Sequence, residues 1–207
     1  MIRIGIAGYG NIGRGVLAAA ASSTDCVPVA IFTRRDPRRL RDVPEGVERV
    51  SLNDIAAYKD TIDVLILCGG SRSDLPLQGP KLAEQFNIVD SFDTHAAMLD
   101  YLGRVDTAAR AGNKTAVISA GWDPGLFSMM RLISSSVLPG RTPYTFWGRG
   151  VSQGHSEAIR SIEGVAGGIQ YTIPVDSAIE AIRAGENPEL TARQKHTRLC
   201  YVVPEPG

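Results

Sequence analysis

Short apolar runs alternate with stretches of helical periodicity up to about residue 121. The apolar runs predict six strands, which are Ile2–Ala7, Val27–Phe32, Val47–Val50, Val64–Cys68, Ile88–Asp90 and Thr115–Ser119. The stretches between them predict four helices, which are Ile12–Ala21, Leu52–Tyr58, Pro80–Phe86 and His95–Ala111. The first, fourth and sixth strands are apolar nearly throughout, which is typical of strands covered by helices on both faces. Alternation of this kind predicts an α/β fold with an open, doubly wound parallel sheet.

The pattern changes after Gly121, where a helix is predicted over Leu126–Val137. The elements expected beyond it are strands at Tyr144–Trp147, Gln170–Ile173 and Leu199–Val203 and a helix at Ser177–Ala184. Glycine and polar residues dominate between Gly148 and Gly168, which predicts a loop, and the last strand has no evident partner. We therefore expect two domains, residues 1–121 and residues 122–207, the second being part of an α+β domain with a more antiparallel sheet.

Composition indicates an ordinary globular protein, with 43% hydrophobic and 21% charged residues in a chain of 207. The 22 basic and 22 acidic residues cancel, so the overall charge favours neither nucleic acid nor a membrane as a partner. No apolar run is long enough to span a membrane, and the start reads as a strand, unlike a secretion signal. The three cysteines are far apart, which is typical of reduced thiols and indicates neither a disulfide framework nor a zinc site. We expect a cytoplasmic protein without a bound metal.

A G-x-G-x-x-G run occupies Gly8-Tyr9-Gly10-Asn11-Ile12-Gly13, after an apolar strand and at the start of a helical stretch. That context is the one that a dinucleotide-binding turn requires. The first glycine allows a tight turn, the second leaves room for a pyrophosphate, and the third lets the helix pack against the strand. The helix start then favours the anionic pyrophosphate. Residues 1–121 are therefore predicted to be a Rossmann-type domain; the alternative is a glycine turn that binds no nucleotide.

Thr33, Arg34 and Arg35 stand at the end of the second predicted strand, where NAD-binding domains place an acid. An acid there bonds the ribose 2′-hydroxyl and repels a 2′-phosphate. Two guanidiniums and a hydroxyl suit a dianionic phosphate instead, and one arginine could also stack on the adenine. The pattern favours NADP over NAD. The alternative is a solvated basic loop, which is our interpretation of Arg38, Arg39 and Arg41.

Three further segments follow strands and therefore lie at the carboxyl edge of the sheet, where ligands bind. Their residues are Cys68, Gly69, Gly70 and Ser71, then Asp90, Ser91, Phe92 and Asp93, then Ala120, Gly121, Trp122, Asp123 and Pro124. Asp93 and Asp123 thus converge on one rim, where each could hold a substrate ammonium beside the apolar Trp122. The alternative for each of them is a helix cap.

The motifs GYGNIGR, FTRRD, LCGGS, SAGWDPG, FWGRGVSQGHSEA and IQYTIP occur in this order over nearly the whole chain. Together they resemble the meso-diaminopimelate dehydrogenases of bacterial lysine biosynthesis. The glycine run alone is shared with many families, whereas Trp-Asp-Pro-Gly followed by Trp-Gly-x-Gly-x-Ser-Gln-Gly-His-Ser is much more specific.

The resemblance implies a homodimeric, NADP-dependent enzyme. Its reaction oxidises the D-amino centre of meso-2,6-diaminoheptanedioate to L-2-amino-6-oxoheptanedioate and releases ammonia. The segments implied to line the cofactor are Tyr9 to Ile12, Thr33 to Arg35, Cys68 to Ser71, Ser91 to Asp93 and Ala120 to Pro124. The residues implied to contact the substrate are Asp93, Asp123, Trp147, Gln153, Gly154, Thr172 and Arg198. Family members continue past residue 207 and carry a further His and Asn at the substrate, so the resemblance implies an incomplete second domain.

These residues suit a diacid with an amine at each end. Arg198 is a bidentate partner for a carboxylate, and Thr172 could add a hydroxyl bond to the same head. Asp93 and Asp123 would hold the reacting ammonium, whereas His155 in its Gly-Ser loop is more typical of a hydrogen-bonding residue than of a general base. Two alternatives remain open. One is another NADP-dependent oxidoreductase, such as a dihydrodipicolinate-type reductase or an aspartate-derived dehydrogenase, and the other is a non-catalytic NADP-binding module.

Overall fold

The computed structural model describes residues 1–206, apart from the side chain of Gln153. The chain divides into two compact units, Met1–Ile133 and Ser134–Gly207, and each is described by itself. Within residues 1–206, no helix is both long enough and apolar enough to cross a membrane.

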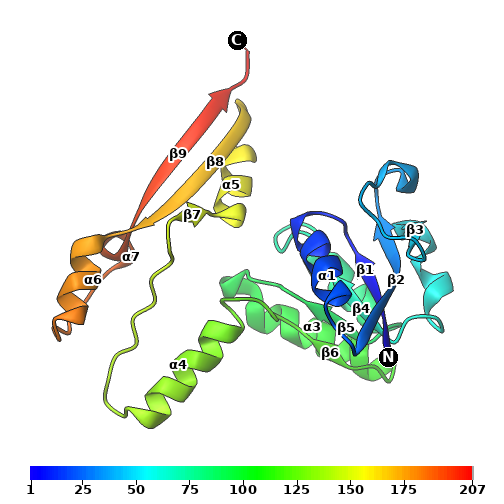
Figure 1. Ribbon diagram of the computed structural model, residues 1–207, viewed down its shortest axis with the longest axis horizontal. Coiled ribbons are helices and arrows are strands. Elements are labelled where there is room, and N and C mark those ends of the chain that lie inside the picture. Colours follow the sequence, from blue (N-terminus) through cyan, green and yellow to red (C-terminus); the bar gives the residue numbers. More distant parts are fainter. Residues whose placement is uncertain (207) are drawn as a thin grey trace. The chain divides into compact units, whose positions relative to one another are not determined.

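The first unit is built on a six-stranded parallel sheet of order β3-β2-β1-β4-β5-β6 (Figure 1). Its strands are β1 (Ile2–Ala7), β2 (Cys26–Thr33), β3 (Glu48–Ser51), β4 (Val64–Leu67), β5 (Ile88–Asp90) and β6 (Ala116–Val117). The order reverses between β1 and β4, because β2 pairs with one edge of β1 and β4 with the other. Such a reversal opens a crevice at the carboxyl ends of the strands, which is where dinucleotides bind. The doubly wound prediction is confirmed.

Helices connect these strands on both faces of the sheet. They are α1 (Asn11–Ala21), α2 (Leu75–Ala83), α3 (Met98–Ala111) and the 3-10 helices η1 (Pro37–Arg39), η2 (Leu52–Tyr58) and η3 (His95–Ala97). A further helix, α4 (Leu126–Val137), follows the last strand of the sheet. The predicted helix over residues 95–111 thus begins with a 3-10 turn.

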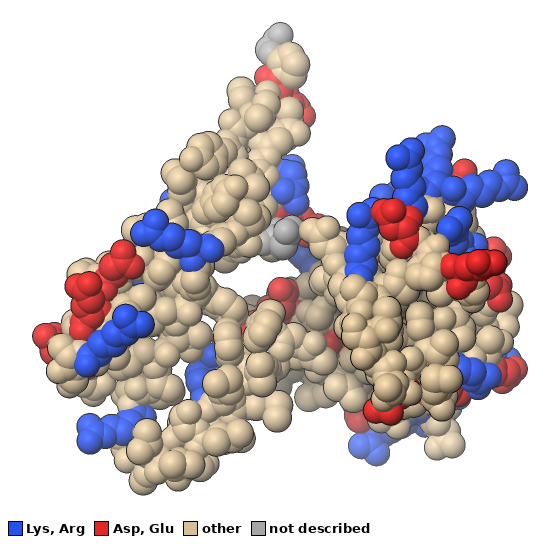
Figure 2. Space-filling model, viewed as in Figure 1, with Lys and Arg blue, Asp and Glu red and all other residues tan. Residues whose placement is uncertain are grey.

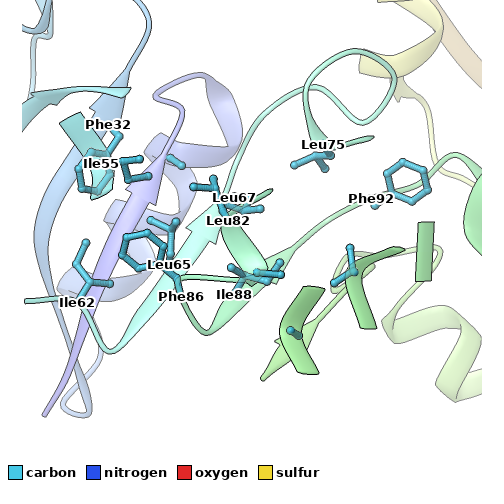
Figure 3. Packing of buried hydrophobic residues seen from close by; sticks show 14 of the residues in the cluster. Phe32, Ile55, Ile62, Leu65, Leu67, Leu75, Leu82, Phe86, Ile88 and Phe92 are labelled. Atoms are coloured by element: carbon cyan, nitrogen blue, oxygen red, sulfur yellow. The ribbon is translucent and has the colours of Figure 1, made fainter. Parts of the chain in front are cut away.

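The core forms where the central strands meet the helices, as Figure 3 shows for Phe32, Leu65 and Leu67. These side chains are at most 1% exposed, so β4 is buried as its apolar sequence predicts. The prediction for the sixth strand is wrong in this respect. It forms only β6, an edge strand paired with β5 alone, and its Val117 is 50% exposed.

Helix α2 begins at Leu75, so the predicted helix over residues 80–86 is misplaced. Pro76 in the first turn is the true start signal, and Pro80 lies inside the helix. Proline lacks the N–H that would bond the carbonyl one turn earlier. Arg104 of α3 supplies a replacement, because its Nη1 donates to the Pro76 carbonyl at 2.9 Å.

The second unit contains a three-stranded antiparallel sheet of order β7-β8-β9. Its elements are β7 (Gly150–Val151), α5 (Gln153–Arg160), β8 (Val165–Pro174), α6 (Asp176–Arg183), α7 (Ala192–Lys195) and β9 (His196–Pro204). The α+β prediction is confirmed, with three corrections. Residues 144–147 form no strand, the expected loop between Gly148 and Gly168 holds β7 and α5, and the last strand pairs along its length with β8.

Helix α5 was missed because its glycine and serine residues are poor helix formers, and packing stabilises it instead. Gly168 of β8 lets α5 approach closely, since a Cβ there would lie 2.4 Å from Cγ2 of Ile159.

We predict that Gly79→Ala lowers the free energy of unfolding by about 1–3 kcal/mol, because overpacking displaces a buried neighbour. A Cβ at Gly79 of α2 would lie 2.0 Å from Oη of Tyr101, a side chain that is fully buried. The matched control is Gly103→Ala on α3, where a Cβ meets nothing within 4 Å. That change is expected to stabilise the protein by about 0.5–1 kcal/mol. Urea unfolding measures both, and equal stability of the two variants would contradict the packing described.

Candidate functional site

The glycine turn after β1 has the geometry that a dinucleotide requires. Gly8 has φ +102°, a left-handed conformation that favours glycine. A Cβ at Gly13 would lie 2.1 Å from the Gly8 carbonyl oxygen, so only glycine fits, whereas the space above Gly10 is open. Gly10 caps α1 without a side-chain hydrogen bond, which leaves N–H groups of the first turn available to an anion. The residues present therefore fit a pyrophosphate.

The arginines after β2 lie beside this turn. Nη2 of Arg35 donates to the Tyr9 carbonyl at 3.1 Å. Arg34 makes a two-point ion pair with Asp74, and Oγ1 of the buried Thr33 accepts the backbone N–H of Arg35. Figure 2 shows Lys and Arg side chains, interspersed with acids, gathered over this edge of the first unit. Residues 33–35 thus form a basic rim, and the buried Thr33 hydroxyl fixes its backbone through the bond from Arg35.

Arg38 and Arg39, further along this loop, make fewer contacts with the rest of the first unit. The backbone N–H of Arg38 donates to Oδ1 of Asp36. The Arg39 side chain is 85% exposed, and its Nε lies as far as 4.0 Å from Oδ2 of Asp36, which makes a weak ion pair. This agrees with a solvated loop. Tyr9 is buried, and its Oη donates to the Asp42 carbonyl, so its backbone is the part open to a cofactor.

The loops after β4 and β5 are joined by Ser71. Its Oγ accepts the backbone N–H of Asp93 at 2.8 Å and lies 3.2 Å from Oγ1 of Thr94. The Asp93 side chain is exposed, while the N-cap residue Thr94 makes no side-chain cap bond. Burial raises the pKa of the Cys68 thiol to about 12, so this thiol is unreactive at neutral pH.

A buried carboxylate, Asp90, holds the loops after β5 and β6 together. Its Oδ1 accepts the N–H groups of Phe92 (3.0 Å) and Ser119 (2.9 Å), and its Oδ2 accepts the Tyr101 hydroxyl at 2.5 Å. Its carbonyl accepts the N–H of Ala120 at 2.7 Å. Phe92 stacks on Tyr101 with ring centroids 4.0 Å apart. Phe92 is therefore part of the support beneath the rim. The loops after β5 and β6, which carry predicted site residues, are both anchored by Asp90.

The Asp123 carboxylate is fixed by α4. Arg131 donates Nη1 to Oδ2 at 3.0 Å and Nη2 to Oδ1 at 2.5 Å, and the Ser128 hydroxyl donates to Oδ1 at 3.3 Å. The hydrogen bonds from Arg131 lower the pKa of Asp123 below its usual range. The pairing thus favours the ionised form of the Asp123 carboxylate, which suits this group better to holding a cation than to taking up a proton. The neighbouring Trp122 is 63% exposed.

The second unit brings two of the predicted substrate residues together. Thr172 of β8 and Arg198 of β9 are directly paired across the strands. Gly154 lies in the first turn of α5 and is exposed, while the Gln153 side chain lies outside the described part of the chain. The backbone N–H of Trp147 donates to Nε2 of His196 at 2.8 Å. His155 lies 2.7 Å from Oγ of Ser152 through Nδ1, which supports its interpretation as a hydrogen-bonding residue.

Three residues that position the site were not predicted, namely Asp74, Tyr101 and Arg131, and for Asp90 the anchoring role was not predicted. Asp90 carried a signal, because it is an acid that ends an apolar strand. Asp74 carried another, because it stands immediately before the Leu-Pro start of a helix. Neither signal identifies the partner, which for Asp74 lies 40 positions away.

Residues 121–207 match the model of the diaminopimelic acid dehydrogenase C-terminal domain. Along all of its length the chain is 57% identical to a meso-diaminopimelate D-dehydrogenase of Ureibacillus thermosphaericus. Over 98% of its length it is 43% identical to the enzyme of the same name from Corynebacterium glutamicum. The chain spans 63% of the first of these relatives and 62% of the second.

Solved structures give the same result. A multiply substituted Clostridium tetani meso-diaminopimelate dehydrogenase with DAP has a TM-score of 0.89 at 50% identity, matching 99% of this chain and 63% of that one. The C. glutamicum DAP dehydrogenase in complex with DAP has a TM-score of 0.89 at 42% identity, with 99% and 62% matched. An engineered D-amino acid dehydrogenase bound to NADP⁺ has a TM-score of 0.88 at 40% identity, with the same coverage.

We predict a pH-dependent stability carried by His196. Burial, followed by the charges of Lys195 and Arg198, lowers its pKa, and its Nε2 must be unprotonated to accept the Trp147 N–H. The unfolded chain therefore takes up a proton first as the pH falls through about 6.5, and stability declines from there down to the lowered pKa of the folded protein.

Thermal midpoints at pH 7.5 and 5.5 in the wild type and in His196→Gln measure this effect. The drop between the two pH values is expected to be smaller in the variant, since glutamine can accept the bond without titrating. An equal drop in both proteins would remove His196 as the cause.

Proposed function

The chain is related along its whole length to the meso-diaminopimelate D-dehydrogenases, and we propose that it carries the coenzyme half and part of the substrate half of such an enzyme. The activity is NADP-dependent oxidative deamination of the D-amino centre of meso-2,6-diaminoheptanedioate, which yields L-2-amino-6-oxoheptanedioate and ammonia. The observation that carries the proposal is the Asp123 carboxylate, which Arg131 fixes in the loop after β6, the last strand of a doubly wound parallel sheet.

The coenzyme assignment is supported by the glycine turn and the arginine rim. Gly8, Gly10 and Gly13 leave space for a pyrophosphate beside the free N–H groups at the start of α1. Arg34 and Arg35 stand where an acid would select NAD. When bound, the nicotinamide supplies the redox chemistry by accepting a hydride from the substrate's D-configured carbon.

The protein's own residues bind and orient the substrate. Asp123, kept ionised by Arg131, would hold the reacting ammonium, and the exposed Asp93 is the group available to take its proton. Loss of hydride from the carbon leaves an imine, which water attacks to release ammonia. Orientation is the main contribution that an enzyme adds to such a step.

The second unit would supply ligands for the carboxylates of the diacid. The paired Thr172 and Arg198 offer a hydroxyl and a forked guanidinium to one head. Gln153 and Gly154 would bind the other, and Trp147 would form an apolar wall. A homodimer in the cytoplasm is part of the same proposal, carried over from the family resemblance.

Activity tests the proposal directly. The native protein should form NADPH from NADP⁺ with meso-2,6-diaminoheptanedioate, and much more slowly with the LL isomer, which lacks a D-centre. Activity with a different amino acid or semialdehyde, and none with the meso compound, would favour another oxidoreductase of this architecture.

The double variant Arg34→Ala/Arg35→Ala is predicted to weaken NADP binding roughly a hundredfold, since charge-assisted bonds to the 2′-phosphate are lost. NAD should weaken less than about tenfold, because it lacks that phosphate. Dissociation constants from calorimetry provide the test, with Arg38→Ala/Arg39→Ala on the solvated part of the loop as the matched control. Equal losses for the two coenzymes would refute the phosphate assignment.

Asp123→Asn is predicted to lower kcat roughly a hundredfold, because the ammonium loses its charged anchor. Asparagine keeps one oxygen acceptor for Arg131 but loses the charged two-point pair, so only part of the α4 contact is retained. Steady-state kinetics and the NADPH dissociation constant are measured together, and the latter should change little. Unchanged turnover would exclude Asp123 from the site.

A further inference from the structure

The two arginines of the coenzyme rim are held in different ways. Arg34 is paired edge-on with Asp74, with Nη1 2.8 Å from Oδ1 and Nη2 3.1 Å from Oδ2. Arg35 donates Nη2 to the Tyr9 carbonyl, and within the described residues it has no carboxylate partner. The two guanidiniums are neighbours in the sequence, but they differ in the structure. The charge of Arg34 is compensated by a carboxylate that also fixes its side chain, whereas the charge of Arg35 is not compensated by a carboxylate in the described part of the chain.

Asp74 is itself rigidly placed. Its Oδ2 accepts the N–H of Gly70 at 2.9 Å, and its own N–H donates to the Gly70 carbonyl at 2.8 Å. Gly69 lets it approach, since a Cβ there would lie 2.7 Å from Cβ of Asp74. The carboxylate thus joins the loop after β4 to the loop after β2 at the start of α2, which a flexible surface acid would not do.

The exposure of the pair is uneven. The Asp74 side chain is 12% exposed and that of Arg34 is 68% exposed. The pairing uses the edge of the guanidinium that carries both terminal nitrogens, and edge-on pairing leaves the flat faces of the plane accessible. A flat, charge-compensated plane suits stacking on a base, whereas a dianionic phosphate placed there would meet the Asp74 carboxylate and be repelled.

We propose that Asp74 is a positioning residue of the coenzyme site, which locks Arg34 as a platform for the adenine ring and leaves Arg35 as the ligand of the 2′-phosphate. This inference rests on the NADP assignment above. The adenine is common to NADP and NAD, so Asp74 and Arg34 govern the affinity for both coenzymes. Arg35, which retains free N–H groups and a full charge, governs the preference between them.

The test is calorimetric titration of the native protein with NADP⁺ and with NAD⁺, which requires no turnover. Asp74→Asn keeps an acceptor for Gly70 but loses the charged two-point pair. It should weaken both coenzymes by the same factor, roughly three- to tenfold, leaving their ratio unchanged. Arg34→Lys, which keeps the charge and removes the plane, should do the same. Arg35→Ala should weaken NADP⁺ by about a further tenfold or more relative to NAD⁺.

Asp36→Asn is the matched control. Asp36 lies on the same rim and caps η1, and it has no bond to Arg34. If removal of any acid strengthens NADP⁺ by reducing repulsion, Asp36→Asn and Asp74→Asn will both do so, and the inference is overturned. It is also overturned if Asp74→Asn changes the ratio of the two affinities, or leaves both as they were. Wild-type protein that binds NAD⁺ as tightly as NADP⁺ would instead refute the proposed coenzyme, a result separate from any effect of Asp74.

Discussion

The hydrogen bonds of the buried Asp90 carboxylate are the interaction on which the candidate site at the carboxyl edge of the sheet depends. Asp90 ends β5 and receives hydrogen bonds from the loops after β5 and β6 and from Tyr101 of α3. A buried carboxylate is costly unless its oxygens are bonded, so the three donors must stay in place for the unit to be stable. Asp93 and Asp123 lie in these two loops, so the bonds to Asp90 that stabilise the fold also hold the segments that carry them.

Carboxylates recur in this supporting role. Asp74 joins the loops after β2 and β4, as Asp90 joins those after β5 and β6, and Asp123 is itself held by Arg131 of α4. Several acids near the carboxyl edge thus hold loops or pair with arginines, and Asp93 and Asp123 are the ones that we propose to face the substrate. Asp90 is 2% exposed and belongs to the supporting acids, whereas Asp93 is exposed and the N-cap of η3 is Thr94.

Periodicity was sufficient to predict the sheet of the first unit, because its central strands are apolar runs ended by turns. It failed at α2, where two prolines compete as start signals and only the contact of Arg104 with Pro76 explains how Pro80 is tolerated. It failed again at residues 144–147 and at α5, where pairing and packing across the chain override local preference. That the segments after these strands share one edge could be predicted from the parallel sheet, while their roles at a ligand stay a prediction. The partners of their residues could not be predicted, because the Arg34–Asp74 and Asp90–Ser119 contacts join distant positions that no local pattern connects.

We propose that this rim binds NADP and orients the D-centre of a diaminodiacid. A crystal structure of the native protein with NADP⁺ and meso-2,6-diaminoheptanedioate tests it most directly. We expect to find the 2′-phosphate on Arg35 and the D-centre ammonium within hydrogen-bonding distance of Asp93 and Asp123. A coenzyme bound away from the arginines, or an ammonium held by other residues, would contradict it.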